Sequence, residues 1–583
     1  MIFEKRNSFT NYIFQQGMKR NIITLIFLII TFVASMSART VTINLGASVG
    51  KDVTKQLRAQ LSQLSPSDNV NIALSKKGNY YLSGTVEAKC NVAISGTGEN
   101  SKFILCNGTD KGDFKAFIDD SFLEFIGTKE HPIAVDIHDI SIDLQEHSGL
   151  WWQRNADGTR TEKFAVKIYH ANRVSVKNVD SKLKNAFCTT FNLRICSNIT
   201  FSNCKLTNYN NCSEGGIIWI EGATANVSIT DNVFNKYGND EALAFYGLQQ
   251  EIKNSLAANG TIAKKDISIT DNVFNYHYGE KGKTAIINDV LISFYSTETD
   301  NSTPCSFDNI SFSSNKLNIS DPVKITLLFR INKKETYSEF SIADNQFLNT
   351  KGNSNNKNFY KTDIKIEDNS DFRNKQPVEI SNNSFINESA VITKWGSTGL
   401  SHIQMTGGDA IYTNNKINDV RAAEDQKGGI LAFITASANL NLIGNSATGL
   451  EMLCCVSDGE GVRNVAINAS DNLFEGATTI YCDKVQHLDL NFKRNTFRSA
   501  NMNFFLQEFA KEGTVTFTNN VVSVKGGNGQ LMTHWGNSDT KNMRFSKLII
   551  TGNTFYGVDN AKSMLINLQN IVTKTIAQNS YYH

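Results

Sequence analysis

Residues 227–234 read VSITDNVF, and residues 267–274 repeat this stretch almost letter for letter as ISITDNVF. The order apolar, polar, apolar, polar, any residue, asparagine, any residue, apolar returns at 340–347 (FSIADNQF), 378–385 (VEISNNSF), 515–522 (VTFTNNVV) and 548–555 (LIITGNTF). Taking this asparagine as a marker gives a longer series: Asn178, Asn203, Asn232, Asn272, Asn315, Asn345, Asn383, Asn415, Asn445, Asn472, Asn495, Asn520, Asn553 and Asn579. The mean spacing of about 31 residues indicates an internal repeat.

The repeat unit is predicted to be all-β. Strict alternation of apolar and polar residues is typical of strands with one buried face, and no stretch between the markers carries a long helical period. Units of 23 to 43 residues cannot bury their own apolar face, but stacking them at about 4.8 Å per coil does so. Asparagine tolerates left-handed turns, and stacked amides can hydrogen-bond as a ladder. These features predict a right-handed parallel β-helix.

A propeller is excluded because the 23 residues between Asn472 and Asn495 are too few for one blade. The two ends of the predicted solenoid differ. Residues 52–64 are expected to form a helix that closes the first coil, with one apolar face made by Val53, Leu57, Leu61 and Leu64. At the other end, residues 576–581 form a last repeat whose open edge is either protected by its own side chains or paired with another segment.

The first 38 residues resemble a targeting segment. Met18 is followed by two basic residues, residues 22–33 are apolar or threonine, and residues 35–38 supply small side chains, as in a secretory signal peptide. The apolar stretch is shorter than the roughly 20 residues of a membrane span, so no transmembrane segment is expected. We therefore expect translation to start at Met18 and the exported chain, periplasmic, cell-surface or extracellular, to begin near residue 38 or 39.

Composition supports a folded chain without a nucleic-acid partner. The 583 residues are 40% hydrophobic and 20% charged, and the net charge is only +2, so no strongly basic surface is predicted. Ten cysteines are too few to staple a chain of this length, and they are predicted to be small core residues. The predicted organisation is: 1–38, upstream residues and signal peptide; 39–105, N-terminal cap and first coils; 106–583, parallel β-helix.

A capping helix, a Gly-x-Tyr turn at residues 78–80 and stacked coils marked by asparagine resemble the pectate lyase superfamily of secreted polysaccharide lyases and glycosidases. The resemblance covers nearly all of residues 45–583. It implies a solenoid that acts on polysaccharides, but the same fold serves lyases, hydrolases, epimerases and phage tailspikes, so activity has to be argued from the site.

Candidate site residues follow from reading one strand per coil inward and outward. With Val166 and Ile168 facing in, Lys167 and Tyr169 face out, and the following coils are read in the same way. The outward residues include charged and aromatic side chains where a merely solvated face favours serine, threonine and asparagine. This reading selects the candidates Lys167, Tyr169, Arg194, Trp219, Glu221, Tyr246, Tyr295 and Arg330.

Residues 238–245, GNDEALAF, are similar to the Gly-Asp-Asp-x-Ile-Ala-Ile strand of polygalacturonase-type glycosidases, in which adjacent acids activate water and protonate the leaving group. The resemblance implies catalytic roles for Asp240 and Glu241. The sequence departs from the pattern because the second acid is glutamate and no His-Gly pair or Arg-x-Lys signature follows. The alternative is a turn whose carboxylates cap backbone amides or bind Ca²⁺.

A lyase needs a cation beside the uronate carboxylate, a base for the α-proton and an acid for the leaving oxygen. Arg194 and Arg330 supply cations, and Lys167, Tyr169 or Tyr246 supplies the acid or base. Carboxylates suited to Ca²⁺ are Glu214, Glu221, Asp240 and Glu241. The residues predicted to bind substrate are Trp219, His277 and Tyr295.

Three functions remain open at this point. The leading hypothesis is a secreted lyase that cleaves a uronic-acid-containing polysaccharide, of the glycosaminoglycan or pectic type, by β-elimination. The alternatives are a glycoside hydrolase using Asp240 and Glu241, and a non-catalytic β-helix that binds glycan or builds a surface structure. The site is expected on the outward face between Lys167 and Arg330, where the spacing of the markers is longest.

Overall fold

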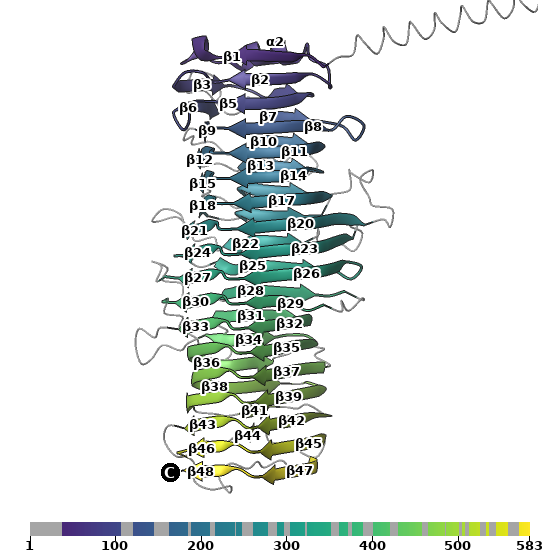
Figure 1. Cartoon of the computed structure of the whole chain (residues 1–583), viewed down its shortest axis with the longest axis vertical. Coiled ribbons are helices and arrows are strands. Elements are labelled where there is room, and N and C mark those ends of the chain that lie inside the picture. Colours follow the sequence, from purple (N-terminus) through teal and green to yellow (C-terminus); the bar gives the residue numbers. More distant parts are fainter. Residues whose placement is uncertain are drawn as a thin grey trace, which may run out of the picture.

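The computed structural model describes residues 38–582 apart from the segments 106–120, 145–162, 185–187, 210–215, 239–240, 248–260, 278–287, 296–303, 321–322, 351–360, 371–375, 389–399, 420–428, 457–463, 484, 501–503, 508–511, 525–531, 536–543 and 558–570. The described strands pair in parallel, coil upon coil, as Figure 1 shows from α2 at one end to β47 and β48 at the other. The predicted right-handed parallel β-helix is confirmed.

Each coil contributes one strand to each of three faces. Face A is the 18-stranded sheet: β1 Thr40–Asn44, β2 Asn69–Ala73, β5 Asn91–Ser95, β8 Ile133–His138, β11 Ala171–Lys177, β14 Ser197–Ser202, β17 Thr224–Thr230, β20 Ile262–Thr270, β23 Cys305–Ser313, β26 Thr336–Ala343, β29 Val378–Ser381, β32 Gly408–Thr413, β35 Ala438–Ile443, β37 Asn464–Ser470, β39 His487–Lys493, β42 Glu512–Thr518, β45 Arg544–Thr551 and β47 Ile571–Ala577.

The 30-stranded sheet bends at a corner into faces B and C, and β36 Ser446–Val456 and β38 Leu473–Asp483 run through that corner. Face B holds β3 Gly78–Leu82, β6 Ser101–Leu105, β9 Ser141–Leu144, β12 Asp180–Lys184, β15 Lys205–Tyr209, β18 Val233–Tyr237, β21 Val273–His277, β24 Lys316–Ile319, β27 Gln346–Asn349, β30 Ser384–Asn387, β33 Lys416–Asp419, β40 Thr496–Ala500, β43 Val521–Val524, β46 Thr554–Tyr556 and β48 Ser580–Tyr582.

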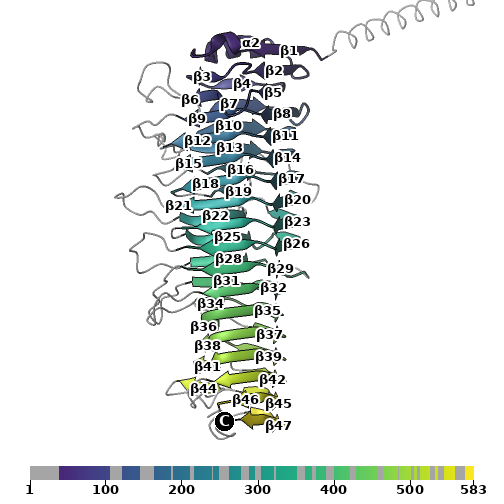
Figure 2. The same ribbon diagram turned by 60° about the vertical axis from the view of Figure 1, so that its left-hand side comes forward.

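Face C carries the candidate site. Its strands are β4 Val86–Ala88, β7 Ser121–Ile126, β10 Lys163–Tyr169, β13 Cys188–Arg194, β16 Ile218–Glu221, β19 Leu243–Tyr246, β22 Asn288–Tyr295, β25 Val323–Ile331, β28 Lys361–Asp368, β31 Leu400–Thr406, β34 Ile430–Ile434, β41 Phe504–Gln507 and β44 Met532–Trp535. In Figure 2 the strands from β7 to β34 form one continuous column down the solenoid.

The N-terminal cap agrees with the sequence pattern. Helix α2, Thr54–Leu61, follows the short 3₁₀ turn η1, Gly46–Ser48, and buries Val53, Leu57 and Leu61 against the first coil. The helix is shorter than the predicted stretch because Ser62 already closes it, and Leu64 is only partly buried. No helix in the described part of the chain is long and apolar enough to cross a membrane.

The marker asparagines form a buried ladder. From Asn232 to Asn579, Nδ2 of each side chain donates to Oδ1 of the asparagine in the next coil over 2.8–3.2 Å. The same Nδ2 also donates to a backbone carbonyl, as Asn345 does to Phe312 O at 2.9 Å. The amides therefore supply hydrogen bonds to buried backbone groups at the turn between faces A and B.

Two markers were misplaced by one residue. Asn178 and Asn203 adopt φ of 54° and 53°, and the ladder positions in their coils belong to Val179 and Cys204, whose carbonyls accept from the next coil as the ladder residues do. In later coils the left-handed residue likewise precedes the ladder asparagine, as Asp231 does with φ of 56°. The asparagine of the repeat therefore serves the ladder, and its predecessor makes the turn.

Substituting one ladder asparagine is expected to destabilise the fold strongly. Asn345→Ala removes the acceptor of Asn315 and the donor to Phe312 O, leaving buried polar groups without partners. We expect the free energy of unfolding to fall by about 2–4 kcal/mol, measured by urea titration. The exposed Asn71 on β2 provides the control, since Asn71→Ala should change it by less than about 0.5 kcal/mol. Equal effects of both variants would refute the ladder's contribution.

The seven described cysteines whose side chains are placed are free thiols in the core: Cys90, Cys196, Cys204, Cys305, Cys454, Cys455 and Cys482. This confirms the prediction that these cysteines are core residues. Burial raises the pKa of the Cys196 thiol to about 12, so it has little thiolate character at neutral pH.

Candidate active site

The predicted outward residues of face C lie in one column. Strand register aligns, coil after coil, Tyr169, Arg194, Glu221, Tyr246 and Tyr295, and then places Arg330 beside Glu367. A second column lies at the position between the two inward residues of each strand. It aligns Lys167, Asn192, Trp219, Ala244 and Ser293. Their inward neighbours, including Ile168, Leu193, Ile220 and Phe245, are buried. The inward assignment is thus confirmed, whereas Asn192, Ala244 and Ser293 of the second outward column are buried as well. The two columns are called the face C strip below.

An ion pair lies at the centre of the face C strip. Arg194 Nε is 2.7 Å from Glu221 Oε2, and Asn192 Nδ2 donates to Glu221 Oε1 at 2.7 Å. Arg194 and Glu221 stand on neighbouring strands because β13 pairs with β16 in register. Among the described residues, the buried Asn192 Oδ1 accepts no hydrogen bond, and the buried Trp219 Nε1 beside it donates none. The cluster therefore holds a cation and a carboxylate, with two buried polar atoms beside them.

Glu241 forms the second polar centre. It lies two residues before the start of β19, and its carboxylate accepts from Tyr246 OH at 2.7 Å and from Ser293 Oγ at 3.2 Å. Burial raises the pKa of Glu241 above its ordinary value, although the hydrogen bond from Tyr246 opposes that rise. Tyr246 also stands beside Glu221 by strand register. Tyr246 therefore bonds one glutamate of the strip and is the register neighbour of the other.

Aromatic rings follow the polar centres. The rings of Trp219 and Tyr246 meet edge to face at 5.4 Å between centroids, and those of Tyr246 and Tyr295 do so at 4.9 Å. The Arg330 guanidinium lies 5.6 Å from the centroid of Tyr295. An apolar path thus runs along the solenoid axis from β16 to β25, and edge-to-face contacts hold the rings at fixed angles.

Both ends of the strip carry ion pairs. Lys167 Nζ is 3.4 Å from Glu124 Oε1 on β7. At the other end Glu367 binds both Arg330 and Lys365. Burial raises the pKa of Glu367, but the hydrogen bonds from Arg330 and Lys365 outweigh burial and lower it overall. Lys167 and Arg330 are therefore charged partners of carboxylates on neighbouring coils.

His277 is separate from the face C strip. It lies on β21 of face B, where its ring stacks on Tyr237 at 4.8 Å, and Tyr237 stacks on Tyr209 at 4.3 Å. His277 Nδ1 is 3.1 Å from Ser320 Oγ. The placement does not bring His277 together with Trp219 and Tyr295, which the sequence analysis grouped with it as substrate-binding residues.

Glu214 and Asp240 lie outside the described residues, so the predicted Ca²⁺ site stays a prediction. Of the two described candidates, Glu241 uses its carboxylate to accept from Tyr246 and Ser293, and Glu221 pairs with Arg194 and accepts from Asn192. Within the described ranges, no group of three histidine, cysteine, aspartate or glutamate side chains comes close enough to hold a metal ion. The described residues by themselves do not fit a calcium site, and no chemical step is derived through one.

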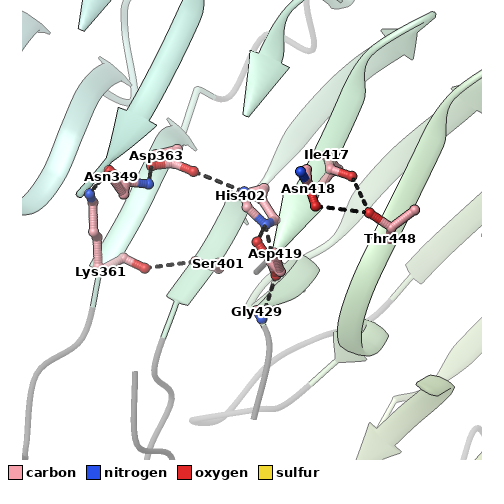
Figure 3. Close-up of polar contacts among 10 residues, drawn as sticks. All are labelled: Asn349, Lys361, Asp363, Ser401, His402, Ile417, Asn418, Asp419, Gly429 and Thr448. Atoms are coloured by element: carbon pink, nitrogen blue, oxygen red, sulfur yellow. Dashed lines mark hydrogen bonds and ion pairs between the residues drawn. The ribbon is translucent and has the colours of Figure 1, made fainter. Parts of the chain in front are cut away.

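Sequence reasoning missed a buried charge network farther along the solenoid, shown in Figure 3. His402 Nδ1 is 2.9 Å from Asp363 Oδ2, and His402 Nε2 is 3.2 Å from Asp419 Oδ1, with all three side chains almost fully buried. Asn349 Nδ2 donates to Asp363 at 3.1 Å and also contacts Lys361 through its amide oxygen. Gly429 N donates to Asp419 at 2.6 Å. The network joins five strands, or their ends, across the corner between faces B and C.

An alignment of the coils contains the signal for this network. Asp363 and His402 each precede an inward isoleucine, Ile364 and Ile403, and these isoleucines are register partners. The equivalent corner positions in earlier coils are Ala242 and Leu291. A charged residue in a column of buried apolar residues therefore marks the network.

The comparisons with known proteins found only distant structural similarities. No family model matches the sequence, and no curated protein matches it. Among solved structures, bacteriophage CBA120 tailspike protein 3 has 9% identity and a TM-score of 0.34, covering 90% of this chain and 62% of its own. DFA-IIIase from Arthrobacter chlorophenolicus A6 has 11% identity and a TM-score of 0.29, covering 75% and 93%. The PL6 family alginate lyase AlyGC has 11% identity and a TM-score of 0.22, covering 93% and 100%.

The strand pairing of the chain itself defines it as a parallel β-helix protein with an N-terminal capping helix. The fold that the resemblance implied, a parallel β-helix, is thereby confirmed. The chain spans 62% of the length of the tailspike structure.

Proposed function

We propose that the protein is a carbohydrate-active enzyme that cleaves a uronic-acid-containing polysaccharide by β-elimination on the face C strip. The observation that carries this proposal is the register of Arg194, Glu221 and Tyr246 on three successive strands. Neighbouring strands lie about 4.8 Å apart, so a cation, a carboxylate and a phenol face the same side within two strand spacings. These are the groups that β-elimination needs.

The chemistry can be assigned to these side chains. Arg194 neutralises the uronate carboxylate, which makes the adjacent carbon–hydrogen bond more acidic. Tyr246 takes that proton while its own hydroxyl proton passes to Glu241, which accepts the hydrogen bond from Tyr246 at 2.7 Å. The electron pair forms the new carbon–carbon double bond as the glycosidic oxygen leaves, and Tyr246 protonates that oxygen. The proton on Glu241 then returns to the phenol.

Substrate binding is assigned to groups that already face outward. The rings of Trp219, Tyr246 and Tyr295 offer apolar surface along the solenoid axis. A sugar chain lying parallel to the axis meets all of these groups.

The proposal is tested by incubating the exported chain, beginning near residue 39, with a panel of glycosaminoglycan and pectic polymers. The expected result is ultraviolet absorbance from an unsaturated uronate at the new chain end with at least one polymer. Neutral polymers are the control. Binding without any product would instead favour a non-catalytic glycan-binding β-helix.

The pH dependence of turnover should follow Glu241. In β-elimination Glu241 must be ionised to accept the phenolic proton, and its pKa is raised by burial. The value of kcat/KM is therefore expected to rise as pH increases through that raised pKa. Ser293→Ala removes a hydrogen bond that favours the ionised form, and should move the rise to higher pH. A profile that falls over the same range would contradict the base role.

Glycoside hydrolysis is the second candidate, and the raised pKa of Glu241 favours it. A carboxyl group that stays protonated can serve as a general acid, and Glu221, which is in an ion pair, can serve as the second carboxylate. Asp240, the partner that the sequence suggested, lies outside the described residues. This candidate predicts new reducing ends without the unsaturated chromophore, and activity that falls as pH rises through the pKa of Glu241.

A further inference from the structure

We propose that Lys264 is a positioning residue of the face C site, holding the backbone on both sides of Glu221 from inside the solenoid. The inference rests on the proposed function, because it assigns Lys264 to the residue whose carboxylate pairs with Arg194. Lys264 belongs to β20 on face A, so the sequence gives no hint that it reaches the site strand.

The geometry behind the inference is a pair of short contacts in the core. Lys264 is fully buried, and its Nζ lies 2.7 Å from Gly222 O and 3.4 Å from Ile220 O. These carbonyls belong to the residues directly before and after Glu221. The Glu221 side chain points to the opposite side of the strand, toward Arg194 and Asn192. One ammonium group therefore fixes the peptide units that flank the site carboxylate.

The backbone needs such a restraint at this point. Strand β16 ends at Glu221, and Gly222 adopts φ of 75°, in the left-handed region where glycine is favoured. A chain that leaves a strand through a glycine has little side-chain packing to hold it. The Lys264 ammonium supplies a fixed contact to Gly222 O, and a rigid strand end keeps Glu221 within reach of Arg194.

The position of Lys264 is costly for a lysine, which indicates a specific use. Its register partners on the neighbouring strands are Thr224 and Phe307, both buried without charge. Burial lowers the pKa of Lys264 to about 8, while Cys305, Glu221 and Glu335 act in the opposite direction. The ammonium is therefore charged at neutral pH and loses its proton as pH rises through about 8. An apolar residue would fill the same space without this penalty.

A second buried lysine provides a matched control. Lys361 is also in the core, burial also lowers its pKa to about 8, and its amino group contacts Asn349 in the charge network near β28. Lys361→Met removes a buried ammonium without touching the strand that carries Glu221. Comparing Lys264→Met with Lys361→Met separates loss of a core lysine from loss of the restraint on Glu221.

The test measures kcat and KM for the polymer that the parent protein cleaves. For Lys264→Met we expect kcat to fall about 10- to 100-fold with KM within about twofold. Displacing Glu221 shifts Arg194, the cation of the proposed reaction, while the binding surface remains. The parent should lose activity as pH rises through about 8, and Lys264→Met should lack this alkaline limb of the pH profile. Lys361→Met should keep both the parent kcat and the alkaline limb. Unchanged kcat in folded Lys264→Met, or an equal loss in Lys361→Met, would overturn the inference.

Two further measurements keep the inference testable. If Lys264→Met does not fold, Lys264→Gln retains a neutral donor and should show a smaller loss of kcat without the alkaline limb. If the parent cleaves no polymer, the proposed function fails and the inference is judged from crystal structures of the parent and Lys264→Met. Separation of the Glu221 carboxylate from Arg194 in the variant would support the positioning role. An unchanged ion pair would refute it.

Discussion

Replacing Tyr246 by phenylalanine is expected to lower kcat/KM for polysaccharide cleavage by at least about 100-fold, the usual scale for removing an acid or base catalyst. The phenol donates a hydrogen bond to Glu241, and Tyr246 is the register partner of Glu221 on the neighbouring strand. The ring itself is retained, so the contacts with Trp219 and Tyr295 stay in place. Steady-state kinetics on the cleaved polymer measure the effect.

The matched control for Tyr246→Phe is Tyr481→Phe. Tyr481 lies on β38, on the same hydrogen-bonded sheet but in a later coil, and it is partly exposed. Tyr481 lies beyond the region between Lys167 and Arg330 in which the sequence predicts the site, so this variant should keep the parent kcat/KM. Glu241→Gln should match Tyr246→Phe, since it removes the proton acceptor. Full activity of both site variants, or loss in Tyr481→Phe, would place the site elsewhere on the solenoid.

Replacing His402 by leucine should have the largest effect on stability, a loss of about 3–5 kcal/mol in the free energy of unfolding. The substitution leaves Asp363 and Asp419 buried without their shared cation. Tyr412 lies nearby in the core, and within the described part of the chain its hydroxyl makes no hydrogen bond; it cannot replace the imidazolium charge. Urea unfolding of His402→Leu against the parent measures the loss.

The same network predicts how stability depends on pH. Burial lowers the pKa of His402, but Asp419 and Asp363 outweigh it and raise the pKa to about 10. A raised folded-state pKa means that the contribution is complete below the unfolded value of about 6.5, and is lost as pH rises through about 10. The stability difference between parent and His402→Leu should therefore shrink between these values.

A triple variant tests the origin of the His402 effect. Replacing Asp363, His402 and Asp419 together with apolar residues removes the buried charges as well as their partner, and should recover most of the stability lost in His402→Leu. A single-variant loss below about 1 kcal/mol, or one that does not change with pH, would show that the network does not stabilise the fold as argued.

The fold could be predicted because its signals are local and repeated. Alternation identified the strands, and the asparagine spacing identified the coil, since stacking identical units is the way such short units bury their apolar faces. The errors at Asn178 and Asn203 arose because asparagine can occupy either of two neighbouring positions in a coil. At the first position it makes the left-handed turn, and at the second it belongs to the hydrogen-bonded ladder. Only the hydrogen-bond partners distinguish these roles.

The candidate site was predictable only in part. Alternation identified Arg194, Glu221 and Tyr246 as outward residues, and parallel register placed them together. The hydrogen bond between Tyr246 and Glu241 depends on how the strand enters face C at its corner, which no residue pattern reveals. Lys264 was unpredictable for another reason. A lysine in an alternating strand is expected to face solvent, and its burial depends on the carbonyls of another face.

The most direct measurement of the central claim is product analysis after cleavage of a defined uronate oligosaccharide in water enriched in heavy oxygen. In β-elimination no water is consumed, so the two products together have the mass of the substrate and carry no label from the solvent. Hydrolysis adds one water across the broken bond and places its oxygen in a product. The account predicts unlabelled products, one of them unsaturated, with the parent protein and a loss of both products in Tyr246→Phe. Labelled, saturated products would contradict β-elimination on the face C strip.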